Sequence, residues 1–192
     1  MDNLLIMMEA LGKMIQGKYI KKRSFLFVSI ISILAICFST GMAKYGTDIV
    51  SKIKPIKDDI PAGFTYGKIP IFAKKVLKDN PWMMDKNAIK KLADKIYPDG
   101  NYNKISGIHV TIMTRHNNPF GDDIVCYIIL YNNISSARAE IEKMTKFAEF
   151  NQDRVIVLAQ DNVAVYLHVD DVDNFHFIKQ IANHIEERIS KN

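Results

Sequence analysis

The feature that most constrains this chain is an uncharged apolar segment near its N-terminus, residues 24–43. It contains neither a charged residue nor a proline, and Lys21, Lys22 and Arg23 directly precede it. A helix needs about 20 apolar residues, rising ~1.5 Å each, to cross a ~30 Å hydrocarbon layer. The segment therefore predicts a membrane-inserting helix, followed by a separate folded domain.

Three fates of this segment are compatible with its sequence. It can remain as an uncleaved anchor, which we favour, or it can be a secretory signal cleaved after Gly41-Met42-Ala43. As a third alternative, Leu34-Ala35-Ile36-Cys37 resembles a bacterial lipobox, whose cysteine receives a lipid. Ile36 departs from the small residue expected before that cysteine, and Cys37 is the candidate lipidation residue.

The basic residues around the segment predict its orientation. Four of them lie from Lys18 to Arg23, whereas only Lys44 closely follows the apolar stretch. Because basic residues near a span tend to stay on the cytoplasmic side, residues 1–23 are expected to be a cytoplasmic leader. The C-terminal domain is then outside the cytoplasm, held at a cell membrane by one span or a lipid. Met14 is an alternative start of translation.

Charge argues against a nucleic-acid partner. The formal net charge of +5 includes five basic and two acidic residues up to Arg23, which leaves 21 basic and 19 acidic residues from Lys44 onward. Phosphate binding usually needs a cluster of Lys and Arg that this nearly neutral domain lacks. The expected partners are the lipid bilayer, through residues 24–43, and a protein or envelope ligand. The excess of Lys over Arg is the bias of an AT-rich, bacterial genome.

Beyond the span, the pattern predicts a linker over residues 44–67 and an α+β domain over residues 68–192. The linker assignment rests on its prolines and glycines and on its weak periodicity. Helical signals begin at Pro70, and a second helix is expected from Asn80, as its cap, to Ile96.

From Ser106 onward, a strand-strand-helix order is predicted twice. Its strands are residues 108–112, 124–131, 154–159 and 163–169, and its helices run from Ser135 to about Phe150 and from Asn174 to Ile189. Short connections favour antiparallel pairing. The expected fold is a four-stranded, mainly antiparallel sheet with helices packed on one face.

Polar residues cluster most densely around the last predicted strand and helix, in His168, Asp170, Asp171, Asp173 and His176. Imidazoles and carboxylates together can hold a divalent cation. The competing interpretation, which we favour, is that Asp171 and Asp173 cap the final helix and Asp170 lies in a turn.

A second histidine could join this cluster. His109 and His168 each lie on the strand face opposite its aliphatic residues, so they could be neighbours in one sheet. The only thiol beyond the span, Cys126, lies in an apolar run and is expected to be buried.

Two functions from different classes follow. The first is a membrane-tethered binding or structural module, which needs no catalytic residues. The second is a metal-dependent or hydrolytic envelope enzyme built on His109, His168 and the Asp170–Asp173 turn. We favour the first, because no nucleophile, phosphate-loop, metalloprotease or cofactor motif is evident.

Overall fold

A computed structural model describes residues 48–68, 81–118 and 123–190, which belong to one compact unit, Thr47–Asn192. The leader, the predicted membrane segment, Cys37 and the predicted helix after Pro70 lie outside the described residues. Within the described ranges, no helix combines the length and apolar character that a membrane crossing requires.

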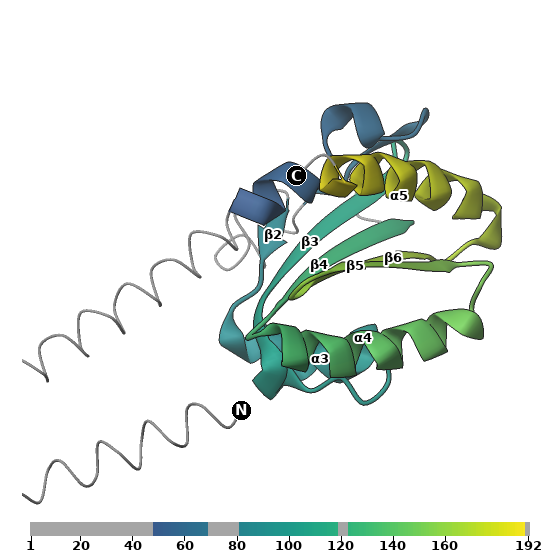
Figure 1. The fold of residues 1–192 in the computed structure, drawn as a ribbon. Helices are drawn as coiled ribbons and strands as arrows, with labels where there is room; N and C mark the ends of the chain where they lie inside the picture. Colours follow the sequence, from purple (N-terminus) through teal and green to yellow (C-terminus); the bar gives the residue numbers. More distant parts are fainter. Residues whose placement is uncertain (1–47, 69–80, 119–122, 191–192) are drawn as a thin grey trace, which may run out of the picture. The chain divides into compact units, whose positions relative to one another are not determined.

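The described residues of the domain form an antiparallel sheet of six strands at its core (Figure 1). Five of them follow the spatial order β1-β3-β4-β6-β5, and β2 also pairs with β3. The strands are β1 (Phe64–Tyr66), β2 (Trp82–Met83), β3 (Ile105–Arg115), β4 (Ile124–Tyr131), β5 (Val155–Gln160) and β6 (Val163–Val169). The four predicted strands are present, and two short strands join them.

Helices cover both faces of this sheet (Figure 1). Helix α5 (Phe175–Ser190) lies on one face, and α3 (Lys86–Ile96) and α4 (Ile134–Glu149) lie on the other. The expectation of helices on one face is therefore wrong.

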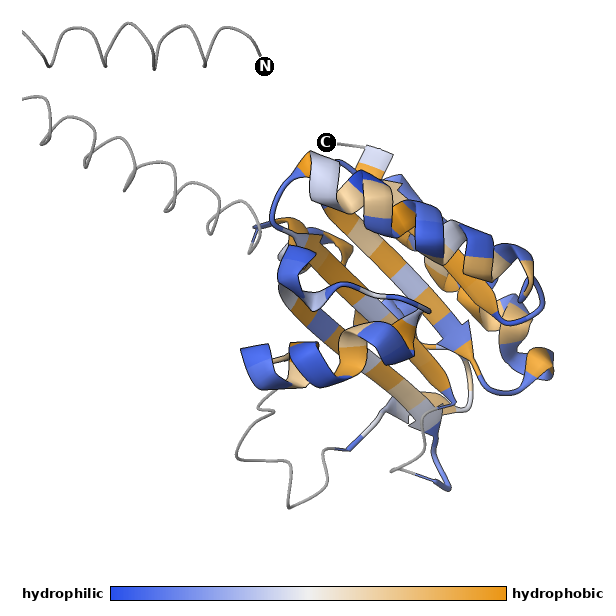
Figure 2. Ribbon diagram, turned by 90° about the horizontal axis from the view of Figure 1, so that it is seen from below, coloured by the Kyte–Doolittle hydropathy of each residue, from blue (hydrophilic) through white to orange (hydrophobic). Residues whose placement is uncertain are grey.

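The physical reason lies in β4, whose side chains are apolar on both sides. Ile124, Cys126 and Ile128 pack in the core under α5, while Val125, Ile129 and Tyr131 pack in the core under α3 and α4. A strand that is apolar on both faces needs a cover on each. Figure 2 shows the mostly hydrophobic strands between helices that carry hydrophilic residues on their outer sides.

The predicted linker is also corrected, because its described part belongs to the folded domain. Residues 48–53 are helical, and Ile49, Val50 and Ile53 are buried in the core under α5. The 3-10 turn η1 (Lys57–Asp59) and strand β1 follow. Prolines and glycines here mark turns between packed elements and do not mark an extended spacer.

The start of the second predicted helix differs as well. Trp82 and Met83 pair with Val110 and His109 of β3, so the chain is extended where a helical turn was expected. Helix α3 begins later, where the Asp85 side chain accepts a hydrogen bond of 2.8 Å from the Ala88 N–H. Pairing with a long neighbouring strand has overridden the local signal of Asn80 and Pro81.

Candidate functional site

The two histidines proposed as neighbours are on opposite faces of the sheet. His109 of β3 pairs with Ile128 of β4, and His168 of β6 pairs with Val125. Directly paired residues share a face, and Ile128 faces the α5 core while Val125 faces the α3 and α4 core. His109 and His168 are thus separated by β4. Burial lowers the pKa of His109, which favours its neutral form.

The acidic turn after β6 is held together by local contacts. The Asp171 carboxylate accepts a 3.0 Å hydrogen bond from the Asp173 N–H and caps the 3-10 turn η4 (Val172–Asn174). His176 Nδ1 donates to the Asp173 carbonyl at 2.8 Å. His168 Nδ1 lies 3.7 Å from Asp170 Oδ1. The prediction that Asp171 and Asp173 cap the final helix is therefore corrected: Asp171 caps η4, directly before α5, and Asp173 lies within that turn.

The described residues do not bring the six candidates into one site. No group of three or more His, Cys, Asp and Glu side chains in the described ranges could hold a metal ion. The hypothesis of a metal-dependent or hydrolytic enzyme required these side chains to converge in a cleft. The described residues do not show this convergence, so they do not support the enzyme hypothesis.

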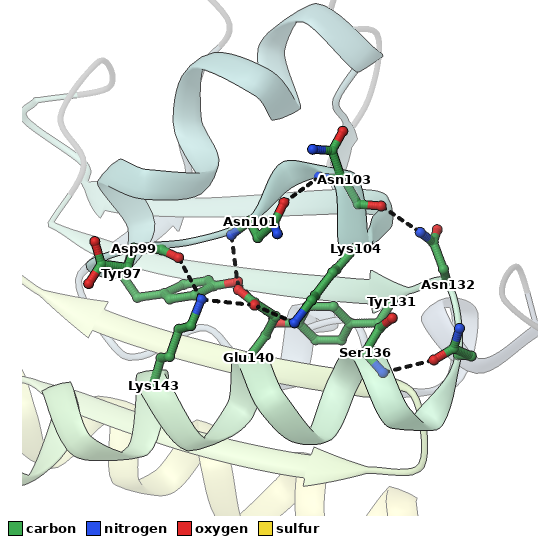
Figure 3. A network of polar contacts seen from close by, with 11 residues as sticks. Tyr97, Asp99, Asn101, Asn103, Lys104, Tyr131, Asn132, Ser136, Glu140 and Lys143 are labelled. Atoms are coloured by element: carbon green, nitrogen blue, oxygen red, sulfur yellow. Dashed lines mark hydrogen bonds and ion pairs between the residues drawn. The ribbon is translucent and has the colours of Figure 1, made fainter.

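A buried carboxylate that the sequence analysis did not identify, that of Glu140, extends from α4 toward the segment that follows α3 (Figure 3). Glu140 Oε2 accepts hydrogen bonds of 2.9 Å from both the Tyr97 hydroxyl and the Asn101 N–H. Glu140 Oε1 lies 3.0 Å from Lys143 Nζ and 3.4 Å from Lys104 Nζ. Both oxygens are thus engaged, and the network joins α4 to the segment that follows α3.

The electrostatics of this network favour a charged glutamate. Burial alone would raise the pKa of Glu140, but the hydrogen bonds from Asn101, Lys143 and Tyr97 outweigh it, so the pKa is lowered. Burial, above all, raises the pKa of Tyr97, which stays a neutral donor. One signal in the sequence could have found Glu140: it lies three residues after Ala137 and four before Met144, within the apolar stripe of the helix.

A second buried carboxylate lies on the other face. Asp59 of η1 accepts hydrogen bonds from Arg188 Nη2 at 2.8 Å, Arg188 Nη1 at 3.2 Å and His184 Nδ1 at 3.0 Å. The Ile56 N–H donates to it at 2.8 Å. Burial would raise the pKa of Asp59, but these hydrogen bonds and the charge of Arg188 lower it. The contact fastens the start of the domain to α5.

The two edges of the sheet differ in how they are covered. The outer edge of β3 pairs with β1 over Arg115 to Met113 and with β2 over Val110 and His109. At the opposite edge, β5 pairs with β6, and no further strand among the described residues adjoins it. We call this the open β5 edge, residues Val155–Gln160.

The backbone of the open β5 edge is set up to accept another strand. The Val169 N–H donates to the Arg154 carbonyl at 3.0 Å, which directs the backbone of Arg154 toward β6. Backbone groups alternate along an antiparallel strand, so the N–H and C=O of Val157 and Ala159 point away from β6. Five of the six residues are apolar and none is charged or proline, so the usual devices that protect an edge are missing.

A shallow groove lies beside this edge on the α5 side. It is lined by Ile49, Ile53, Leu158, Ala159, Gln160, Val163, Val165 and Ile189. Four of these residues, Ile49, Ile53, Val163 and Val165, are buried, so the accessible part of the lining belongs to the edge strand and Ile189. The groove has no room for a water-sized sphere, so it is not a pocket for a small molecule.

Comparison with known proteins gives no match: no protein-family model, no curated protein and no solved structure is significantly similar to the chain. The function has to be inferred from the residues of this chain.

Proposed function

We propose that this chain is a membrane-tethered, extracytoplasmic interaction module that binds a partner protein by adding a strand to the open β5 edge. The single observation that carries the proposal is the uncharged, apolar strand Val155–Gln160, whose outward backbone groups form no ladder within the described residues. Strand addition is a common way to recognise an extended segment, because main-chain hydrogen bonds supply affinity and side-chain pockets supply selectivity.

The contrast between the two edges supports this proposal. Short strands cover the outer edge of β3 at both ends, which is a common way to keep a sheet from pairing with other chains. The same protein leaves β5 uncharged and next to an apolar groove. An edge of this kind is either an aggregation hazard or a docking strand.

The tether is supported by residues 24–43, whose length and apolar character match a membrane span. The domain begins at Thr47, a few residues after this segment ends. A module so tethered would lie on the side of the bilayer that the positive-inside bias assigns to the exterior.

The membrane attachment is tested by mass spectrometry. Intact-mass analysis of the membrane fraction should find a chain that begins at Met1 or Met14, whereas a start at Lys44 or a lipidated Cys37 would replace the anchor by one of its alternatives.

The orientation is tested by labelling. A cysteine at exposed Asp94 should react with a membrane-impermeant maleimide in intact cells, while buried Cys126 should not. Reaction of Asp94→Cys only in opened cells would contradict the outside orientation.

The binding surface is tested by photo-cross-linking of the full chain in its native membrane. A photoreactive side chain at Ala159 should form adducts with a partner, and the same side chain at Asp94, on the far side of α3, should not. Ala159 is exposed and its N–H points outward, so Ala159→Pro should leave the fold intact and abolish binding. Leu158→Pro is the matched contrast, because its N–H points to β6 and the substitution should unfold the strand. With the photoreactive side chain placed at Val157 instead, an adduct pattern that Ala159→Pro leaves unchanged would overturn the proposal.

A further inference from the structure

We propose that the partner at the open β5 edge is a second copy of this chain, paired antiparallel about a two-fold axis at Val157. This inference rests on the proposed strand-addition function and names its partner. Identical edge strands can pair with each other antiparallel, and a two-fold interface of this kind is self-complementary.

The register of β5 supports self-pairing. The outward-pointing residues are Val155, Val157 and Ala159, so a two-fold axis at Val157 sets Val157 opposite its own copy and Val155 opposite Ala159. The Val155 N–H already donates to the Asn151 carbonyl at 3.0 Å, so the N–H groups of Val157 and Ala159 would donate the hydrogen bonds of the new ladder. On the α5 side, Ile156 is then opposite Leu158 of the second copy. All of these pairs are apolar, and no like charges oppose each other across Val155–Ala159.

The place where the chain enters the domain fits the same arrangement. A two-fold axis that continues an antiparallel sheet runs perpendicular to the sheet, so each face of one copy continues into the same face of the other. Residues 48–53, the first described part of the domain, pack on the α5 face. Residues 48–53 of both copies would therefore lie on the same face of the joined sheet, an arrangement compatible with two chains tethered to one bilayer.

The contact area on that face is small. Ile49 and Ile53, which line the groove beside Leu158 and Ala159, are already buried within one copy. Pairing of one short strand buries less than the ~1,200–2,000 Å² of a standard stable interface. Confinement of both copies to one membrane raises their effective concentration, so a small interface suffices there. Dilution in detergent should dissociate it.

The experiment is disulfide trapping of the full-length chain in its membrane, in a Cys37→Ser background. In the proposed dimer, residue 157 is directly opposite its own copy in a hydrogen-bonded pair. The Cα atoms of such a pair are ~5.5 Å apart, so the two cysteines of Val157→Cys would be within the range of a disulfide. Mild oxidation should give a product of twice the 21.9 kDa chain mass. In Gln160→Cys, on the same strand, the two cysteines would be about 20 Å apart and should give no such product. Ala159→Pro combined with Val157→Cys should also abolish it.

The photoreactive side chain at Ala159 is the second probe, and it reads the same surface if Val157→Cys does not fold. Adducts between two copies of this chain support the inference. Adducts that contain only a different protein overturn it and leave the strand-addition function standing. The absence of adducts and of disulfide products, in a chain whose thermal unfolding matches the unmodified protein, overturns both.

Discussion

The two faces of the sheet are each fastened by one buried carboxylate, and the two carboxylates differ in their partners. Glu140 lies on a helix and receives a tyrosine hydroxyl, a backbone N–H and two lysines from the segment after α3 and from α4. Asp59 lies in a turn and receives a guanidinium and an imidazole from α5. Glu140 is fully buried, and so is its donor Tyr97, whereas the His184 side chain retains 50% of its exposure.

We therefore expect the contribution of each carboxylate to the free energy of unfolding to depend more on the burial of its hydrogen-bond donors than on the number of its ion pairs. If Asp59 is removed, His184 can turn to solvent, because half of it is already exposed. If Glu140 is removed, the buried Tyr97 hydroxyl keeps, among the described residues, the Tyr131 hydroxyl at 3.4 Å as its hydrogen-bond partner. The face under α3 and α4 should therefore be the more sensitive one.

The largest effect is expected for Glu140→Gln. The amide cannot accept at both former carboxylate oxygens, so buried donors lose a partner and the free energy of unfolding should fall by about 2–4 kcal/mol. Urea unfolding followed by circular dichroism measures this. Glu142→Gln is the matched control on the same helix, because Glu142 is exposed and pairs only with Lys146, and its midpoint should not move. Equal losses in the two variants would contradict the role assigned to burial.

A smaller loss is expected for Asp59→Asn. One oxygen remains to accept from Arg188, and the partly exposed donors regain water, so the free energy of unfolding should fall by roughly 1–3 kcal/mol. Asp58→Asn, at the exposed neighbour, serves as the control. A loss larger than that of Glu140→Gln, measured under the same conditions, would reverse the ranking of the two faces.

Acid should weaken the stabilising contacts of both Asp59 and Glu140. The pKa values of Asp59 and Glu140 are lowered in the folded protein from ordinary values of 3.8 and 4.5. Their contribution is therefore fully present above those ordinary values and is lost as the pH falls through the folded pKa values. Thermal unfolding between neutral pH and pH ~3 should show a steeper decline for the unmodified protein than for the double variant Asp59→Asn/Glu140→Gln. Parallel curves would show that other carboxylates dominate the acid response.

The smallest effect is expected for His184→Ala. Its imidazole is half exposed and Arg188 still pairs with Asp59, so the free energy of unfolding should change by roughly 0–1 kcal/mol. Asn183→Ala, the exposed neighbour on α5, is the control. If His184→Ala matched the loss of Asp59→Asn, the imidazole would be the main partner of Asp59, in place of the guanidinium.

Local patterns predicted the long elements well. The strand Ile124–Tyr131 and the strand Val163–Val169 have the bounds that their apolar runs indicated, and the last helix begins one residue from its predicted start. The elements that were missed, β1 and β2, are short and lack a periodic signal of their own. They exist because β3 offers an unpaired edge at both ends.

The candidate site was harder to predict for a related reason. The sequence shows that His109 and His168 occupy strands, but the face of each depends on register, and β4 lies between them. The open β5 edge has the residues of an ordinary buried strand, and only the order of the sheet makes it terminal. The membrane anchor stays a prediction from residues 24–43.

The sequence by itself determined the α+β composition, the positions of the long strands and helices, and the nearly neutral charge of the domain, because these follow from local periodicity and composition. Tertiary packing placed helices on both faces, made residues 48–67 part of the folded domain, and brought Asp59 to Arg188 and Glu140 to Tyr97. These contacts join residues far apart in the chain, such as Asp59 and Arg188, and their geometry depends on sheet order and register, which no local pattern encodes.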